Sequence, residues 1–221
     1  MTNTILQIIK IDPELIEEIK AAWHRLPETD HVDGKYRLRK YSYVECNIDN
    51  LVSGGAFITD LKERQFTQSS KYNKHQGDKV RTFDLIDENV LRSNAMRKMV
   101  SVFQEECSLP LRFEMNIHQV RVVCKGGATQ LSPEGWHQDG YGCIAMIGID
   151  RCNIIGGELL LSTSKTEPPF LQAVMDDGTM VIIDDNHLWH NGMAIQPIRD
   201  NKPAWMDILI FTAKNEHKKL L

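Results

Sequence analysis

Residues 133–142 (PEGWHQDGYG) contain a histidine and an aspartate that could bind a metal ion together. His137 and Asp139 are two residues apart, so in an extended strand both side chains point to the same face. One imidazole and one carboxylate are two members of the 2-His-1-carboxylate ligand set, which suits Fe(II) and leaves three coordination positions open. A bidentate 2-oxo acid could take two of these positions and oxygen the third. Alone, the His-x-Asp pair is weak evidence, because it occurs by chance in many solvated loops.

A third ligand is expected from residues 179–190 (TMVIIDDNHLWH), where an apolar strand runs into acidic turn residues and then a histidine. His187 and His190 both qualify, but in an extended segment they point to opposite faces, so only one can face the metal. We favour His190, because Trp189 and the strand-like residues 193–195 place it nearer to an ordered element. His187 is expected to bond the backbone of the turn at 184–186.

The elements that must position these ligands are short strands separated by turn signals. From Phe113 onward, strands are expected at residues 117–124, 143–149, 158–162, 171–175, 180–183 and 207–212. The many short strands at this spacing are typical of an antiparallel sandwich or a small barrel. Several of them fit between His137 and His190, which is what a barrel needs to bring two distant segments together.

The first half of the chain is expected to support this β-core. Asp12 and Pro13 predict the start of a helix that ends at Pro27, and a second helix is expected over residues 88–106. Between them, residues 36–45 have the alternation of a strand, and residues 66–81 form a long polar loop. We expect a single domain over residues 1–221, with helical support and a lid loop in 1–112 and the core in 113–214.

Composition and charge exclude several classes of protein. The net charge is −4, and Lys or Arg residues do not cluster apart from the short tail Lys218-Lys219, so neither a nucleic-acid partner nor an anionic membrane surface is expected. The chain has no uninterrupted apolar run of 18 residues and no secretory signal pattern. Its five cysteines are odd in number and form no CxxC pair, which favours a reducing cytoplasm.

The motifs also occur in an order that is much more specific than the three ligands alone. The stretches PEGWHQDG, RCNIIGGELLL, VIIDDNHLWHNGMAIQPI and MDILIFTA resemble the bacterial 2-oxoglutarate/Fe(II) dioxygenases related to L-isoleucine dioxygenase. The stretches YRLRKYSYV and FTQSSKYNKHQGDKVR extend this resemblance over most of the chain beyond Gly34.

The resemblance implies an α+β, mainly β protein: a double-stranded β-helix (jelly-roll) core with an N-terminal helical layer. It implies Fe(II) held by His137, Asp139 and His190, with 2-oxoglutarate and O2 as cosubstrates. The implied reaction is hydroxylation of a free, aliphatic L-amino acid, with release of succinate and CO2.

Four further residues are candidates for the substrate pocket. Arg151 could bind a substrate carboxylate, although a structural ion pair is an equal alternative. Gln68 lies in the long polar loop, where such loops often clamp substrates. Tyr141 and Trp136 flank the ligands and could form the pocket wall, the alternative being ordinary aromatic packing.

The sequence departs from the family pattern at Met206, where an arginine usually precedes the aspartate of the last strand and could bind a dicarboxylate. Two arginines could replace it as the anchor of 2-oxoglutarate. Arg199 is nine residues after His190 but lies in IRDNKP, which has the composition of an exposed turn. Arg121 belongs to the strand expected to pair with the last one, and it shares a polar side with Gln119. We favour Arg121.

Two other functions compete with hydroxylation. A cupin-like metal-binding or sensor protein without turnover would explain Met206, but the intact set of His137, Asp139 and His190 argues against it. A related oxidative outcome, such as desaturation or epimerisation, would keep the enzyme and change its product. Halogenation is disfavoured, because it requires the carboxylate ligand to be absent and Asp139 is present.

Overall fold

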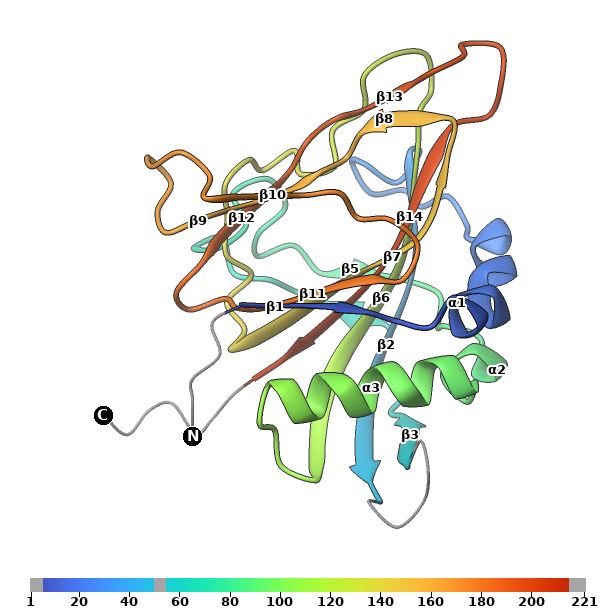
Figure 1. Ribbon diagram of the computed structural model, residues 1–221, viewed down its shortest axis with the longest axis vertical. Helices are drawn as coiled ribbons and strands as arrows, with labels where there is room; N and C mark the ends of the chain where they lie inside the picture. Colours follow the sequence, from blue (N-terminus) through green and yellow to red (C-terminus); the bar gives the residue numbers. More distant parts are fainter. Residues whose placement is uncertain (1–5, 50–54, 215–221) are drawn as a thin grey trace.

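A sheet of seven antiparallel strands forms the centre of the computed structural model, which describes residues 6–49 and 55–214 (Figure 1). The strand order is β1-β11-β7-β14-β6-β2-β3. These strands are β1 (Leu6–Lys10), β2 (Arg37–Ile48), β3 (Ala56–Asp60), β6 (Arg112–Val123), β7 (Cys143–Cys152), β11 (Thr179–Asp184) and β14 (Trp205–Ala213). The tail Lys218-Lys219 lies outside the described residues.

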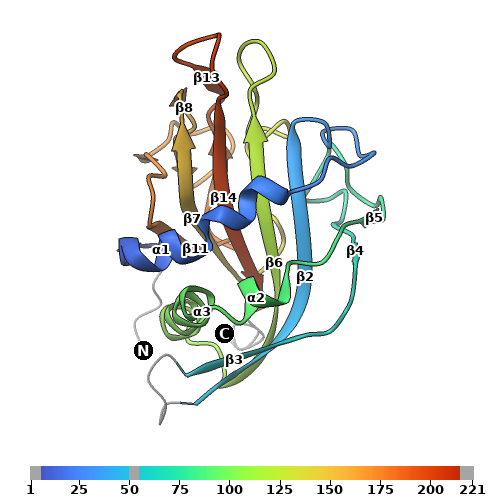
Figure 2. The same cartoon turned by 90° about the vertical axis from the view of Figure 1, so that its right-hand side faces the viewer.

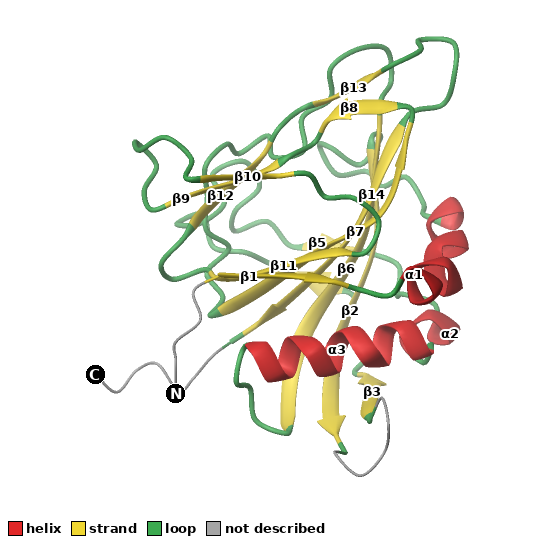
Figure 3. Cartoon of the chain, in the orientation of Figure 1, coloured by secondary structure: helices red, strands yellow, loops and turns green. Residues whose placement is uncertain are grey.

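Short strands cover one face of this sheet (Figure 3). β9 (Leu159–Ser162) pairs with β10 (Leu171–Ala173) and with β12 (Trp189–Gly192), and β8 (Ile154–Gly156) pairs with β13 (Ile195–Pro197). The chain crosses between the large sheet and these short strands several times. The result is the mainly β, jelly-roll architecture that was expected.

The helices cover the opposite face of the large sheet (Figure 2). α1 (Pro13–Lys20) begins as predicted, with the Asp12 carboxylate accepting a hydrogen bond from the Glu14 N–H at 2.9 Å. A 3-10 helix, Ala21–Arg25, follows it and buries Trp23. None of the helices in the described part of the chain is long and apolar enough to span a membrane.

The helix predicted at residues 88–106 is two helices, α2 (Glu88–Leu91) and α3 (Asn94–Glu106). Ser93 separates them: its hydroxyl donates to the Val90 carbonyl at 2.7 Å and accepts from the Met96 N–H at 3.1 Å. A serine that bonds the backbone in this way caps a new helix rather than continuing the old one.

Each face of the large sheet has its own hydrophobic core. On β14, Leu209 and Phe211 pack toward the helices, where Phe211 lies 5.7 Å from Phe103 between ring centroids. The alternate residues Met206, Ile208 and Ile210 face the short strands. Because successive side chains of a strand point to opposite faces, this second layer is where a pocket can form between the sheet and the short strands.

Candidate metal centre

Two backbone hydrogen bonds bring the predicted ligands together. The His137 N–H donates to the His190 carbonyl and the His190 N–H donates to the His137 carbonyl, both at 3.0 Å. His190 lies in β12, whereas His137 forms only this isolated bridge and lies in the segment before β7. Asp139 follows in the same segment.

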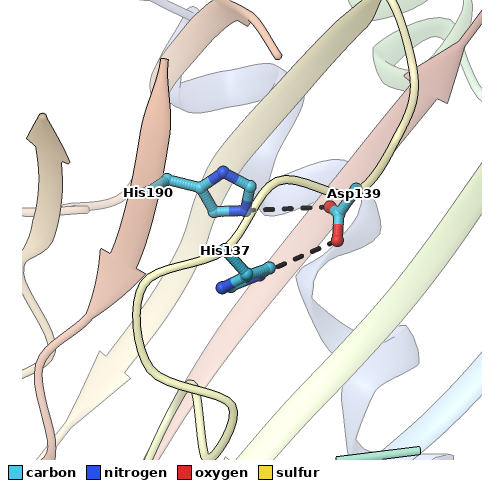
Figure 4. Close-up of side chains that lie close together, drawn as sticks. All are labelled: His137, Asp139 and His190. Atoms are coloured by element: carbon cyan, nitrogen blue, oxygen red, sulfur yellow. Dashed lines mark ion pairs between the residues drawn. The ribbon is translucent and has the colours of Figure 1, made fainter. Parts of the chain in front are cut away.

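The three side chains converge on one point (Figure 4). One ligand atom from each of His137, Asp139 and His190 lies within 4.8 Å of the others. The Nε2 atoms of His137 and His190 each lie 3.7 Å from one oxygen of the Asp139 carboxylate. Two imidazole nitrogens and a carboxylate oxygen therefore surround a common position.

The state of both imidazoles suits a metal. His137 Nδ1 lies 2.8 Å from the Gly135 carbonyl oxygen, which can only accept, so in a neutral imidazole Nδ1 carries the proton and Nε2 keeps its lone pair for a metal. Burial and the neighbouring His137 lower the pKa of His190 to about 3, although Asp139 opposes this. A neutral imidazole is the form that binds a metal.

Asp139 is oriented by the loop that was predicted at residues 66–81. The Gln68 amide donates to the Asp139 carboxylate at 2.8 Å, and the Asn73 amide donates to the Gln68 carbonyl at 3.0 Å. Burial alone would raise the pKa of Asp139, but His190, His137, the Gln68 hydrogen bond and the charge of Arg39 hold it below its usual range. Gln68, predicted as a substrate residue, thus contacts the metal ligand itself.

A second carboxylate holds the backbone of the ligand segment. Asp185 accepts hydrogen bonds from the N–H groups of Asp139, Gly140 and Tyr141 at 2.7–3.1 Å. Its Oδ1 also lies 3.7 Å from Nδ1 of His190, a buried nitrogen with no hydrogen-bond partner in the described part of the chain. Such support of the ligands from outside the coordination sphere is typical of metal sites.

The arrangement fits Fe(II). Its donor set is the 2-His-1-carboxylate set, both Nε2 atoms and the carboxylate face one position, and the remaining sides open on a pocket. His187, the rival ligand, points elsewhere: its imidazole is 59% exposed and its Nδ1 bonds the Asp184 carboxylate at 2.9 Å. The imidazole therefore bonds the turn at 184–186, but through the Asp184 side chain and not through the backbone that was expected.

The pocket has an apolar and a charged side. Ile144, Met146, Ile208 and Ile210 from β7 and β14 line the apolar side, together with Tyr141. The charged side contains Arg37, Arg39, Arg81 and Glu134. Tyr141 thus lies where it was predicted, whereas Trp136 lies outside the lining.

Sequence reasoning placed Arg81 in the long polar loop but missed Arg37, Arg39 and Glu134 as residues of this pocket. The signal for Arg37 and Arg39 was present in YRLRKYSYV, where they alternate on one side of the expected strand, but their side chains reach the site across a neighbouring strand. Glu134 lies beside the ligands, with Oε1 3.4 Å from Nε2 of His137.

Arg151 and Arg199 lie outside the pocket lining among the described residues. The Arg151 guanidinium donates to the Gly156 carbonyl at 2.6 Å and approaches the Met206 sulfur at 3.8 Å, just behind the pocket wall. Arg199 is exposed, and its backbone N–H and carbonyl bond the Asn153 side chain. The contacts between Arg199 and Asn153 hold the turns that contain these two residues together.

Arg121 lies on the helical side of the sheet, which does not fit the anchor role predicted for it. Its guanidinium donates two hydrogen bonds to the Asp207 carboxylate, at 2.7 and 2.6 Å, and stacks 4.5 Å from the Trp205 ring centroid. The neighbouring contact with His24 places it under the N-terminal helices. The side of the strand that Arg121 shares with Gln119 therefore faces the helices and not the pocket.

We expect Arg121→Met to lower the free energy of unfolding by about 3–5 kcal/mol, because it leaves the fully buried Asp207 carboxylate without its partner. Urea unfolding measures the change. The matched control is the double variant Arg121→Met/Asp207→Leu, which removes both charges and should recover most of the stability. A double variant as unstable as the single one would contradict this interpretation.

Comparisons with known proteins agree with the geometry. Residues 20–212 match the model of the 2OG-Fe dioxygenase family. A bsmA homologue from Methylobium petroleophilum PM1 has a similar structure, with 20% identity over 97% of this chain and 90% of that chain and a TM-score of 0.77. IDO from Bacillus thuringiensis is similar too, with 17% identity, coverage of 95% and 90%, and a TM-score of 0.71. These likenesses show the fold, and no curated protein sequence matches the chain.

Proposed function

The chain belongs to the 2OG-Fe dioxygenase family, and from this premise we propose that it hydroxylates an unactivated C–H bond of a free, aliphatic L-amino acid. The family implies Fe(II), 2-oxoglutarate and O2, and the His–Asp–His cluster is present. With 2-oxoglutarate and O2, bound iron supplies the oxidising power for such a reaction, with succinate and CO2 as co-products. The resemblance to enzymes related to L-isoleucine dioxygenase supports the choice of substrate.

One observation carries the choice of substrate: both charge signs and an apolar wall lie in the pocket beside the cluster. A free amino acid is a zwitterion with a side chain that needs an apolar surface. Glu134 offers a partner for its ammonium group, and the arginine side of the pocket offers partners for its carboxylate. Ile144, Met146, Ile208 and Ile210 offer the surface for an aliphatic side chain and exclude water from it.

In this proposal the residues of the chain position the substrate and keep the site ordered. Gln68 and Asp185 fix the carboxylate and the backbone of the ligand segment, so that little reorganisation is needed when the ligands bind. The charged side holds the two ends of the amino acid, and the apolar side directs its side chain toward the cluster.

Mass spectrometry tests the proposal directly. The purified protein with Fe(II) and 2-oxoglutarate is incubated in air with each proteinogenic L-amino acid, and we expect an aliphatic one to gain one oxygen atom with equimolar succinate. The matched controls are the corresponding D-amino acids and the anaerobic reaction. Loss of two hydrogens would indicate desaturation, and no succinate with any amino acid would favour a binding or sensor protein over the proposed enzyme.

A further inference from the structure

The last strand offers no cation to a dicarboxylate in the pocket. The residues of β14 that line it are Met206, Ile208, Ile210 and Thr212, and none is charged. Among the described lining residues, fixed positive charge comes only from Arg37, Arg39 and Arg81. Since a carboxylate without a charged partner is costly in a dry pocket, 2-oxoglutarate must end on one of these guanidinium groups.

Sheet register places two arginines opposite the last strand, Arg37 in the row of Met206 and Arg39 in the row of Ile208. Arg39 on β2 pairs with Val120 on β6, and Val120 pairs with Ile208 on β14, so the three residues form one row across the sheet. Arg39 and Ile208 line the pocket, whereas Val120 is fully buried between them. Arg39 lies two strands away from β14 in the sheet. Its long side chain thus supplies a cation to the pocket wall where β14 itself has no charged residue.

Arg39 also has no anion in direct contact among the described residues. Its side chain is buried, and within the described residues it has no hydrogen-bond acceptor or ion-pair partner, only a stacking contact 5.3 Å from the Phe83 ring centroid. Arg81 shares this lack of a contacting anion within the same part of the chain, but it lies outside the large sheet and its register. Arg37, in contrast, lies 3.5 Å from the Asp33 carboxylate. Burial and the charges of Arg37 and Arg81 lower the pKa of Arg39 to about 9, although the charges of Asp33 and Glu134 oppose this.

We propose that Arg39 binds the distal carboxylate of 2-oxoglutarate, in place of a cation on the last strand. This inference rests on the cosubstrate of the family and not on the amino-acid substrate. In a bidentate pair, the carboxylate accepts hydrogen bonds from guanidinium donors that the protein leaves without acceptors. Its negative charge also neutralises the positive charge of Arg39.

The test compares 2-oxoglutarate with 2-oxopentanoate, which has a methyl group where 2-oxoglutarate has its distal carboxylate. Dissociation constants are measured by calorimetry on the anaerobic Fe(II) protein, without amino-acid substrate. We expect Arg39→Met to raise the dissociation constant of 2-oxoglutarate about 30-fold or more and to change that of 2-oxopentanoate by no more than about threefold. Unchanged binding of 2-oxopentanoate also shows that the variant is folded and still holds iron.

Arg81→Met is the matched control, because Arg81 is another buried guanidinium of the same pocket and stacks 5.0 Å from the Phe66 ring centroid. It should keep the preference for 2-oxoglutarate over 2-oxopentanoate. The proposal is overturned if Arg39→Met keeps that preference, if both ligands weaken equally, or if Arg81→Met alone erases it. Arg39→Met that binds 2-oxoglutarate normally but loses affinity for the amino acid would assign Arg39 to the substrate carboxylate instead.

The outcome is independent of the proposed substrate. If no amino acid is hydroxylated but Arg39→Met loses its preference for 2-oxoglutarate, the anchor stands and the substrate proposal fails. If an amino acid is hydroxylated but Arg39→Met keeps its preference for 2-oxoglutarate, the substrate proposal stands and the anchor fails.

Discussion

Replacing any one of His137, Asp139 and His190 by alanine is expected to abolish turnover and to weaken Fe(II) binding by at least a hundredfold. Each supplies one of three ligand atoms that lie within 4.8 Å of one another, and two remaining ligands cannot complete the face of the octahedron. Succinate formation and Fe(II) dissociation constants measure the two effects.

His187→Ala is the matched control for these variants. It removes a histidine from the same segment whose imidazole is exposed and bonded to Asp184. We expect it to keep most of its activity and its iron. If His187→Ala proved inactive while His190→Ala kept turnover, the third ligand would be His187.

Asp185→Ala is expected to produce the second largest effect, although Asp185 touches neither iron nor substrate in this arrangement. The change leaves the N–H groups of Asp139, Gly140 and Tyr141 without their acceptor, and each unmade buried bond costs about 1–3 kcal/mol. The ligand segment should then lose its shape, with Fe(II) affinity falling about 10–100-fold. Metal titration and urea unfolding measure the two consequences.

Asp185→Asn is expected to have an intermediate effect on iron affinity. An asparagine keeps one acceptor oxygen but places an N–H2 group among the backbone donors, so iron affinity should fall between the wild-type and alanine values. Wild-type iron affinity in Asp185→Ala would show that the segment keeps its shape without this carboxylate.

The metal ligands were predictable because their signal is local. His137 and Asp139 are two residues apart, and His190 follows an apolar strand, so spacing made them candidates and the order of the surrounding motifs selected them. The structure brings them together, and the family match implies the iron and the cosubstrates. The helix break at Ser93 was harder to predict, because the apolar stripe continues across it while a single hydroxyl changes the backbone.

The proposed 2-oxoglutarate anchor, Arg39, was not predictable from the sequence. Its position depends on which face of a strand packs against the helices and which faces the pocket. A shift of one residue moves a side chain to the opposite face of a sheet. In β6, Gln119 and Arg121 face the helices, and Val120 and Val122 face the short strands. Both faces are buried, so hydrophobicity gave no preference, and the position of Arg39 required the register of three strands.

The paired hydrogen bonds between His137 and His190 have a consequence for how such an enzyme can evolve. They fasten the two ends of a long excursion of chain directly to each other, next to the iron ligands. Residues 163–170, between β9 and β10, lie within that excursion and are largely exposed. Insertions and deletions there can be accommodated while the ligand geometry is inherited unchanged, so this part of the chain can change in length without rebuilding the iron site.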